Sequence, residues 1–228
     1  MSNVNPADDS GIGTLSERSL HKVLKLYFEP DSSFHEIETH GAVADIKNGE
    51  GIIEIQRQSF SYLIPKLNRF LQDTPVTVVY PIAAVKTLVT VDKSGEVISR
   101  RKSPGRKTIH DASFELFKIR DFISSPRLNV KLLFLECDEY RKEGRGKRRG
   151  ELLEMIPRRI IHEIDLKSAA DYSVFLPSTL TDVFLAKDFM RHIKSRSRYS
   201  YYSLRLLLHT GHLEIAGKSG RAFIYKRI

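Results

Sequence analysis

Two acidic side chains stand on either side of a tight-turn signal, at a spacing that lets them share one hard cation. Asn48-Gly49 separates two short segments, and this dipeptide is the strongest short-range signal for a β-hairpin. With this turn, Asp45 faces Ile52, and Asp45 and Glu54 become diagonal neighbours on one face. Diagonal neighbours have Cβ atoms up to about 7–8 Å apart, which allows two carboxylates to bind the same cation. The spacing therefore predicts a paired-carboxylate site on a hairpin.

Polar and apolar side chains alternate along the same hairpin. Gln56 follows Glu54 by two residues and points to the same face, because side chains alternate along a strand. The opposite face is apolar and consists of Ala44, Ile46, Ile53 and Ile55. The alternative interpretation is a hairpin whose acids are merely solvated on an exposed face, as in most antiparallel sheets.

The elements around the hairpin follow from hydrophobic periodicity. Apolar residues recur at helical spacing from Ser16 to Phe28, and a continuous apolar run of the kind found in buried strands covers Val76–Ile82. A second helix is expected from about Phe60 to Gln72, with Pro65 in its first turn. The expected strands are Phe34–Thr39, Ala42–Lys47 and Ile52–Arg57. The resulting order is α-β-β-β-α-β.

This arrangement resembles the PD-(D/E)xK phosphodiesterase superfamily, whose α-β-β-β-α-β core carries an acid on the second strand and an acid-x-Lys triplet on the third. Asp45 matches the first acid and Glu54 the second. Ala44 stands where the superfamily has proline, and Gln56 where it has lysine, although some members carry an acid-x-Gln triplet. The resemblance covers roughly residues 14–82 and implies a restriction-endonuclease-like core in an α/β (α+β, mixed-sheet) fold.

The resemblance implies metal-assisted hydrolysis of a phosphodiester. Asp45, Glu54 and the carbonyl of Ile55 would hold Mg²⁺ or Mn²⁺, which polarises the phosphate and lowers the pKa of a bound water. The Gln56 amide would orient that water. Glu17 is a further candidate acid, since superfamily relatives often place one on the first helix. Thr14-x-x-Glu17 also matches a capping box, in which Glu17 only satisfies the backbone of its own helix.

Lys66, on the expected helix after the motif, is a candidate replacement for the missing lysine. The alternative is an ordinary solvated lysine on a helix surface.

The last part of the chain is similar to a winged helix. Helices are expected at Thr181–Met190 and Tyr199–His209, followed by two strands around the basic, glycine-rich turn Gly217–Arg221. In this interpretation the second helix enters the DNA major groove and the wing touches the backbone. Two basic loops, residues 100–107 and 141–150, add charge for phosphate neutralisation. The expected nucleic-acid contacts are Arg101, Lys102, Arg106, Lys194, Arg196, Arg198, Tyr199, Lys218 and Arg221.

The composition favours a polyanionic partner. The 228 residues carry 37 Lys or Arg against 28 Asp or Glu, a net charge of +9. No run approaches about 18 apolar residues, and the polar N-terminus lacks the features of a signal peptide, so no membrane contact and a cytoplasmic location are expected. The single cysteine, Cys137, excludes an intrachain disulfide.

The sequence therefore predicts a loose tail at residues 1–13, a nuclease-like domain at 14–136, a basic linker or loop at 137–150 and a winged-helix domain at 151–228. The expected function is Mg²⁺-dependent DNA endonuclease activity, and a symmetric homodimer is compatible with cutting both strands. The alternatives are a catalytically inactive, DNA-binding protein on a nuclease-like scaffold and an RNA-binding protein.

Overall fold

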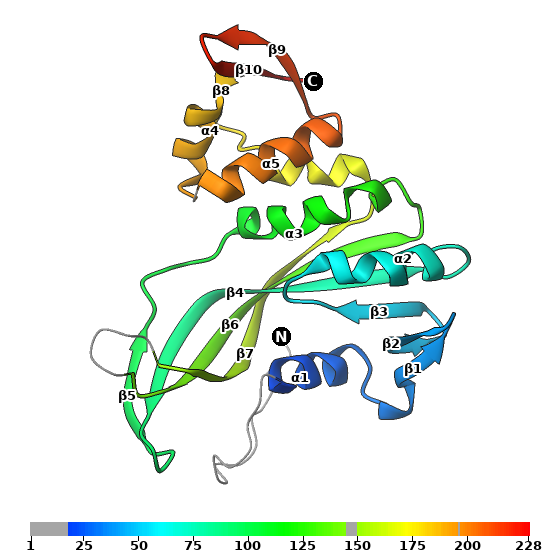
Figure 1. Cartoon of the computed structure of the whole chain (residues 1–228), viewed down its shortest axis with the longest axis vertical. Helices are drawn as coiled ribbons and strands as arrows, with labels where there is room; N and C mark the ends of the chain where they lie inside the picture. The colour runs from blue at the N-terminus through cyan, green and yellow to red at the C-terminus, as the bar shows by residue number, and fades with distance from the viewer. Residues whose placement is uncertain (1–17, 145–149, 196) are drawn as a thin grey trace.

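A seven-stranded mixed sheet forms the centre of the molecule (Figure 1). The computed structural model describes residues 18–144, 150–195 and 197–228. The main path of the sheet is β1-β2-β3-β4-β6-β7, and β5 pairs with β4. Its strands are β1 (His35–Thr39), β2 (Ala42–Asn48), β3 (Gly51–Ile55), β4 (Val76–Val91), β5 (Val97–Lys102), β6 (Leu128–Lys142) and β7 (Leu152–Leu166).

The first half of the sheet follows the predicted order of elements. Helix α1 (Arg18–Phe28) precedes the antiparallel strands β1, β2 and β3. The 3-10 helix η1 (Ser32–Phe34) leads into β1, and η2 (Phe60–Leu63) leads into α2 (Ile64–Phe70), which has Pro65 in its first turn. Helix α2 then returns the chain to β4, which pairs with β3 in parallel. The coarse class is thus α/β with a mixed sheet.

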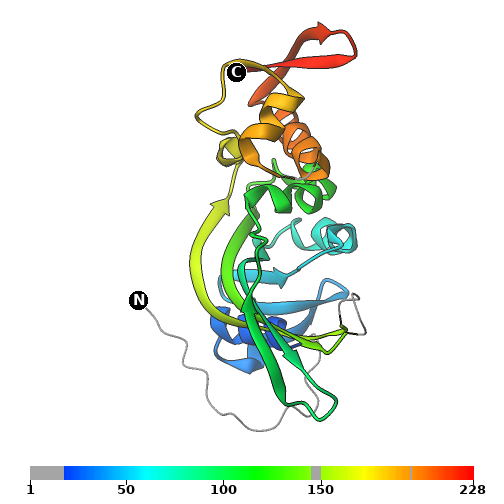
Figure 2. The same ribbon diagram turned by 90° about the vertical axis from the view of Figure 1, so that its left-hand side faces the viewer.

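Helices cover both faces of the sheet. Leu20 and Leu24 of α1 pack with Ile46 and Val79 on one face. The other face is covered by α2 and α3 (Ser113–Lys118), and the short 3-10 helices η3 (Ile109–Ala112) and η4 (Arg120–Phe122) flank α3. Figure 2 shows α1 and the α2–α3 layer on opposite sides of the strands. Strand β4 lies between two parallel neighbours, which explains its nearly continuous apolar sequence from Val76 to Ile82.

Residues 137–150, predicted as a basic linker or loop, join two paired strands rather than two domains in their described part. Strand β6 continues through Cys137 to Lys142, and β7 pairs antiparallel with it from Leu152. Residues 145–149 lie outside the described residues. The basic composition of this segment indicated a boundary, but its strand residues complete backbone hydrogen bonds with one another. The sheet therefore extends to Leu166, and the start of the last unit moves from residue 151 to about residue 168.

The C-terminal unit, residues 168–195 and 197–228, contains a small three-stranded sheet in the order β8-β10-β9. Its elements are η5 (Ala169–Phe175), β8 (Val183–Leu185), α4 (Ala186–Ile193), α5 (Ser197–His209), β9 (Leu213–Ser219) and β10 (Ala222–Arg227). The predicted helix at Thr181–Met190 is wrong at its start, because Val183–Leu185 pairs with β10. The unit packs on α3 at the end of the molecule opposite to α1 (Figure 1). Leu116 of α3 and Leu207 of α5 belong to one buried core.

None of the helices in the described ranges is both long and apolar enough to cross a membrane.

Candidate functional site

The β2–β3 hairpin brings Asp45 and Glu54 together, in a register that differs from the predicted one. Asn48 pairs with Gly51, so the loop consists of Gly49 and Glu50 rather than Asn48-Gly49. The Asn48 side chain accepts a hydrogen bond from the Glu50 amide, which moves the turn one residue along the chain. Each strand residue therefore faces a partner two positions further on than predicted. This even shift leaves Glu54 on the face opposite to Ile53 and Ile55, as predicted. The predicted common face of Ala44 and Ile46 is wrong, because Ala44 packs in the core on the α2 side and Ile46 in the core on the α1 side.

Asp45 stands where the two strands stop pairing. The last paired residues are Ile46 and Ile53, and one step further Asp45 lies opposite Glu54 rather than diagonal to it. The Asp45 Oδ2 atom accepts a hydrogen bond from the Ile55 amide at 2.8 Å, where a backbone carbonyl of β2 would otherwise stand. The side chain therefore replaces one ladder hydrogen bond and fixes the carboxylate between the strand ends.

His21 of α1 holds the same oxygen of Asp45. Its Nε2 atom lies 3.0 Å from Asp45 Oδ2, and Lys25, one turn further along α1, forms an ion pair with Glu36 of β1. Burial opposes ionisation of Asp45, but the hydrogen bond and charge of His21 and the Ile55 amide hold its pKa below the ordinary value. His21 was not predicted as a site residue. The available signal was the i,i+4 spacing of His21 and Lys25, which gives α1 one polar stripe.

Glu54 is buried and pairs with a lysine from a different element. Its side chain is only 2 % exposed, and Lys66 Nζ of α2 lies 3.0 and 2.8 Å from its two carboxylate oxygens. Burial and the neighbouring charge of Asp45 raise the pKa of Glu54 to about 7, although Lys66 acts against this shift. The structure therefore places Lys66 in the site, as one of the two interpretations of this residue expected.

A cleft of about 280 Å³ opens between α1 and the end of β3, where His21, the partner of Asp45, lines it but neither acid does. Gln56 lines it, and its side-chain amide donates to the Gln58 carbonyl at 2.6 Å. Pro81 of β4 also lines the cleft. Proline cannot donate a hydrogen bond to a neighbouring strand, and β3 ends before it would need that bond. The other lining residues are Leu20, His21, Ile55, Arg57 and Gln58.

The oxygen donors at this site fit a hard divalent cation that keeps several waters. Asp45 and Glu54 supply carboxylates, and the Ile55 carbonyl faces β2, on the same side of β3 as the amide that binds Asp45. Such a cation would compete with Lys66 for Glu54. Within the described ranges, no cluster of three or more His, Cys, Asp or Glu side chains has the geometry of a metal site. Backbone carbonyl and water would therefore have to complete the coordination shell.

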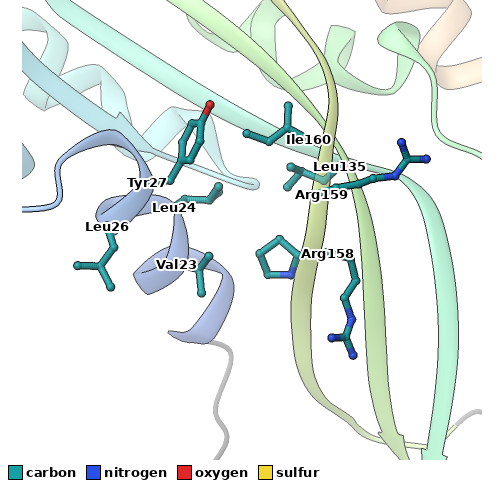
Figure 3. A pocket seen from close by; sticks show the side chains of 9 residues that line it. Val23, Leu24, Leu26, Tyr27, Leu135, Arg158, Arg159 and Ile160 are labelled. Carbon is teal, nitrogen blue, oxygen red and sulfur yellow. The ribbon is translucent and has the colours of Figure 1, made fainter. Parts of the chain in front are cut away.

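A larger groove, of about 450 Å³, lies elsewhere and is apolar (Figure 3). Figure 3 shows Leu24 and Tyr27 of α1 on one side and Leu135 and Ile160 of the sheet on the other. Its two cations already have partners, because Arg158 pairs with Asp138 and Arg159 with Glu136. This groove offers shape and apolar surface but no acid–base group for catalysis.

The predicted nucleic-acid contacts lie in separate places. Arg101 and Lys102 are exposed on β5, and Arg106 is exposed in the loop that follows. Lys218 and Arg221 are exposed on the β9–β10 hairpin, with Lys218 Nζ 5.1 Å from the Phe223 ring centroid. Lys194 is exposed at the end of α4 in a left-handed backbone conformation. Glu17 and Arg196 lie outside the described residues.

Helix α5, the predicted recognition helix, packs lengthwise on α3. The Tyr199 carbonyl accepts a hydrogen bond from Ser113 Oγ at 2.9 Å, and the Tyr202 ring contacts Phe114 and Phe117. Arg198 lies over the Phe114 ring, with 3.6 Å between the guanidinium carbon and the ring centroid. One face of α5 is therefore already covered by protein.

Comparison with known proteins supports the limits of the sheet unit. The profile of a family described as Domain of unknown function (DUF8091) matches residues 18–167, from the start of α1 to just beyond β7. An uncharacterised protein of Treponema pallidum (strain Nichols) is 24% identical over 221 residues, which cover 95% of this chain and 87% of that protein. No solved structure matches the chain. This chain belongs to the DUF8091 family.

Proposed function

We propose that this protein is a metal-dependent nuclease that hydrolyses phosphodiester bonds at the Asp45–Glu54 site. The observation that carries the proposal is the convergence of two acids and a lysine from three elements. Asp45 ends the paired part of β2, Glu54 lies opposite it on β3, and Lys66 of α2 binds both oxygens of Glu54. Acid, acid and lysine around one point is the side-chain set of the PD-(D/E)xK superfamily.

The order of elements supports the same resemblance. Three antiparallel strands lead through α2 to a strand that pairs in parallel with the third, and α1 and α2 lie on opposite faces. In the C-terminal unit, the order β8-α4-α5-β9-β10 and the sheet order β8-β10-β9 support a winged-helix resemblance. The net charge of +9 supports a polyanionic substrate.

Lys66 supplies the positive charge that Gln56 lacks. The superfamily lysine lies two residues after the second acid on the same strand, whereas Lys66 reaches the acid from the adjoining helix. A lysine at either position neutralises charge that develops on the attacked phosphate and steadies the attacking hydroxide. This position of Lys66 supports the resemblance although Gln56 stands in place of the strand lysine.

The other side chains have roles set by their contacts. A bound Mg²⁺ or Mn²⁺ would lower the pKa of a coordinated water and neutralise phosphate charge. Asp45, Glu54 and the Ile55 carbonyl would hold the ion. His21 orients Asp45 and lines the cleft, where it can accept the proton of an attacking water. Gln56 lines the same cleft and can hydrogen-bond to that water or to the substrate.

Plasmid nicking in Mg²⁺ and in Mn²⁺ tests the proposal. We expect Glu54→Gln and Asp45→Asn to lower the nicking rate by at least about a hundredfold, because each removes a ligand of the catalytic ion. Lys66→Met is expected to lower the rate while it leaves cation binding intact or strengthened. Glu50→Gln is the matched control, since Glu50 is exposed on the loop of the same hairpin. Cleavage that survives Glu54→Gln would refute this site.

A second candidate function is binding without hydrolysis. It is favoured by one observation, namely that Lys66 and His21 already contact the carboxylates of both acids. This candidate predicts DNA affinity without cation-dependent nicking, and a chain whose melting temperature does not respond to Mn²⁺. The same binding and nicking assays on structured RNA separate an RNA substrate from DNA.

A further inference from the structure

A second hollow, of about 280 Å³, lies between the end of the α3 segment and α5, and it is lined by two arginines. Phe117 forms one wall, and the guanidinium carbons of Arg120 and Arg205 each lie 4.6 Å from the centroid of this ring. Leu208 and His209 complete the lining. We call this feature the arginine hollow.

The charges in the arginine hollow are only partly compensated. Arg120 Nε lies 3.6 Å from Asp121, whose side chain is 69% exposed, so this pair is solvated and weak. Arg205 donates to the Tyr201 hydroxyl at 3.0 Å and, among the described residues, makes no ion pair. Two guanidinium groups that share one aromatic ring repel each other unless an anion joins them. The geometry thus favours a bound anion.

The side chains around the hollow are held in place before any ligand binds. The ring of Phe117 fixes both guanidinium planes, Arg120 also donates to the Phe117 carbonyl at 3.1 Å, and His209 hydrogen-bonds to the Arg120 carbonyl at 3.0 Å. A guanidinium fork that is held by stacking loses little entropy when it binds both oxygens of a phosphate.

A third arginine extends the positive strip along α5. Arg198 lies over Phe114 and precedes Arg205 by seven residues, which is about 10.5 Å along a helix at about 1.5 Å per residue. One strand of B-DNA advances about 3.4 Å per nucleotide along its axis, so this spacing corresponds to about three phosphates. Helices α3 and α5 lie on the same side of the sheet as α2, which carries Lys66 (Figures 1 and 2).

We propose that the arginine hollow binds a backbone phosphate of the nucleic-acid substrate, and that Arg198 binds a second phosphate of the same strand. The proposal rests on the proposed function only for its substrate class, nucleic acid. It assigns contact with the nucleic-acid backbone to the surface formed by α3 and α5. The winged-helix resemblance instead assigns this contact to the wing and to a helix inserted in the major groove. Contacts to phosphates carry no sequence information, so this surface would anchor substrate without selecting sequence.

Binding of labelled duplex DNA, measured by fluorescence anisotropy in EDTA at several salt concentrations, tests the proposal without cleavage. We expect Arg120→Gln with Arg205→Gln to weaken binding at least about tenfold at 0.1 M salt and to flatten the slope of log affinity against log salt by about 0.9, because one phosphate contact is lost. Lys93→Gln with Arg159→Gln removes the same charge from exposed positions outside the hollow and should leave the slope nearly unchanged.

Further variants separate binding from folding and from the rival surface. Arg120→Lys with Arg205→Lys keeps the charge but loses the planar fork, so the slope should be retained while affinity falls. If the lysine and glutamine pairs lose DNA affinity equally and both have a lower melting temperature, the two arginines have a structural role and the proposal is overturned. If the glutamine pair keeps its full DNA affinity and Lys218→Gln with Arg221→Gln loses it, then the wing binds the DNA backbone instead.

Inorganic phosphate distinguishes the two sources of this ligand. If wild type binds phosphate at matched ionic strength and the glutamine pair does not, while DNA affinity is the same in both, then the hollow is a site for free phosphate and the backbone assignment fails. Loss of DNA affinity in the glutamine pair supports the proposal even if the plasmid is never nicked. Failure of the nuclease proposal would therefore remain distinguishable from failure of this one.

Discussion

Glu54 is deeply buried beside the negative charge of Asp45 and the positive charge of Lys66. Binding of a cation at Glu54 is therefore coupled to the loss of its proton. Burial and the charge of Asp45 raise its pKa to about 7, so below pH 7 the carboxyl is largely protonated and a poor ligand. A divalent cation must then displace a proton, which makes its affinity depend on pH.

We therefore expect the affinity for Mn²⁺, measured by isothermal titration calorimetry, to rise about tenfold per pH unit from pH 5.5 to 7 and to level off above that range. One proton should be released per ion bound at the lower end. Glu54→Gln should remove both the proton release and most of the affinity. An affinity that is constant from pH 5.5 to 7 would mean that Glu54 is not a ligand.

At the scale of residues, spacing in the sequence predicted that the two acids lie close together and left Lys66 as one of two interpretations, but it did not identify His21. Asp45 and Glu54 share a hairpin, so their proximity follows from local geometry. Lys66 is twelve positions from Glu54, and His21 is 24 from Asp45, so their contacts depend on how α1 and α2 pack on the sheet. Periodicity predicts which face of a helix is buried, but not which polar residue at its border meets an acid.

At the scale of elements, the turn that joins β2 to β3 depends on one glycine. Gly51 has a φ of +136°, and a Cβ atom at this position would lie 2.5 Å from the Pro75 carbonyl oxygen. Gly49, in the loop of the same hairpin, has open space where a Cβ would be placed. The backbone geometry therefore requires glycine at position 51 but not at position 49, and the two positions form a matched pair for a test.

We expect Gly51→Ala to lower the free energy of unfolding by roughly 2–3 kcal/mol, because it adds backbone strain and a clash with backbone that cannot easily move. Gly49→Ala should change it by less than about 0.5 kcal/mol. Urea denaturation followed by circular dichroism measures both. Since the clash lies between β3 and the entry to β4, Gly51→Ala should also weaken Mn²⁺ binding at Glu54. Equal destabilisation by the two substitutions would contradict this account.

The prediction of elements succeeded where one local signal dominated and failed where tertiary pairing decided. The helix and strand order from α1 to β4 follows from strong periodicity and a clear turn signal. Val183–Leu185 has the composition of a helix start, but backbone pairing with β10 makes it a strand. Residues 137–142 fall in the segment predicted as a basic linker or loop, yet β6 and β7 pair along them for the same reason. The composition of a segment predicts its solvent exposure better than it predicts which strand it will pair with.

At the scale of the whole molecule, the two units share their core. His110 of η3, which belongs to the sheet unit, is buried and extends between Phe175 and Phe189 of the C-terminal unit. Its Nδ1 atom lies 3.0 Å from Ser203 Oγ of α5. Because this histidine is surrounded by aromatic rings, burial lowers its pKa to about 4. The contact therefore requires a neutral imidazole.

Acid should weaken this connection. Between pH 6.5 and 4 the unfolded chain binds a proton at His110 and the folded chain does not, so the free energy of unfolding falls by about 1.4 kcal/mol per pH unit as the pH decreases. Glu54 acts in the opposite direction, because between pH 4.5 and 7 the folded chain holds a proton that the unfolded chain has released. The two effects partly cancel in the wild type, so only a comparison of variants isolates His110.

His110→Gln keeps a hydrogen-bonding partner for Ser203 and removes the titration. We expect the free-energy advantage of wild type over His110→Gln, measured by urea denaturation, to shrink steadily from pH 6.5 to 4.5. His162→Gln, at an exposed histidine on β7 outside the C-terminal unit, should show no such trend. If the advantage of wild type stays constant over this range, protonation of His110 does not act on the junction.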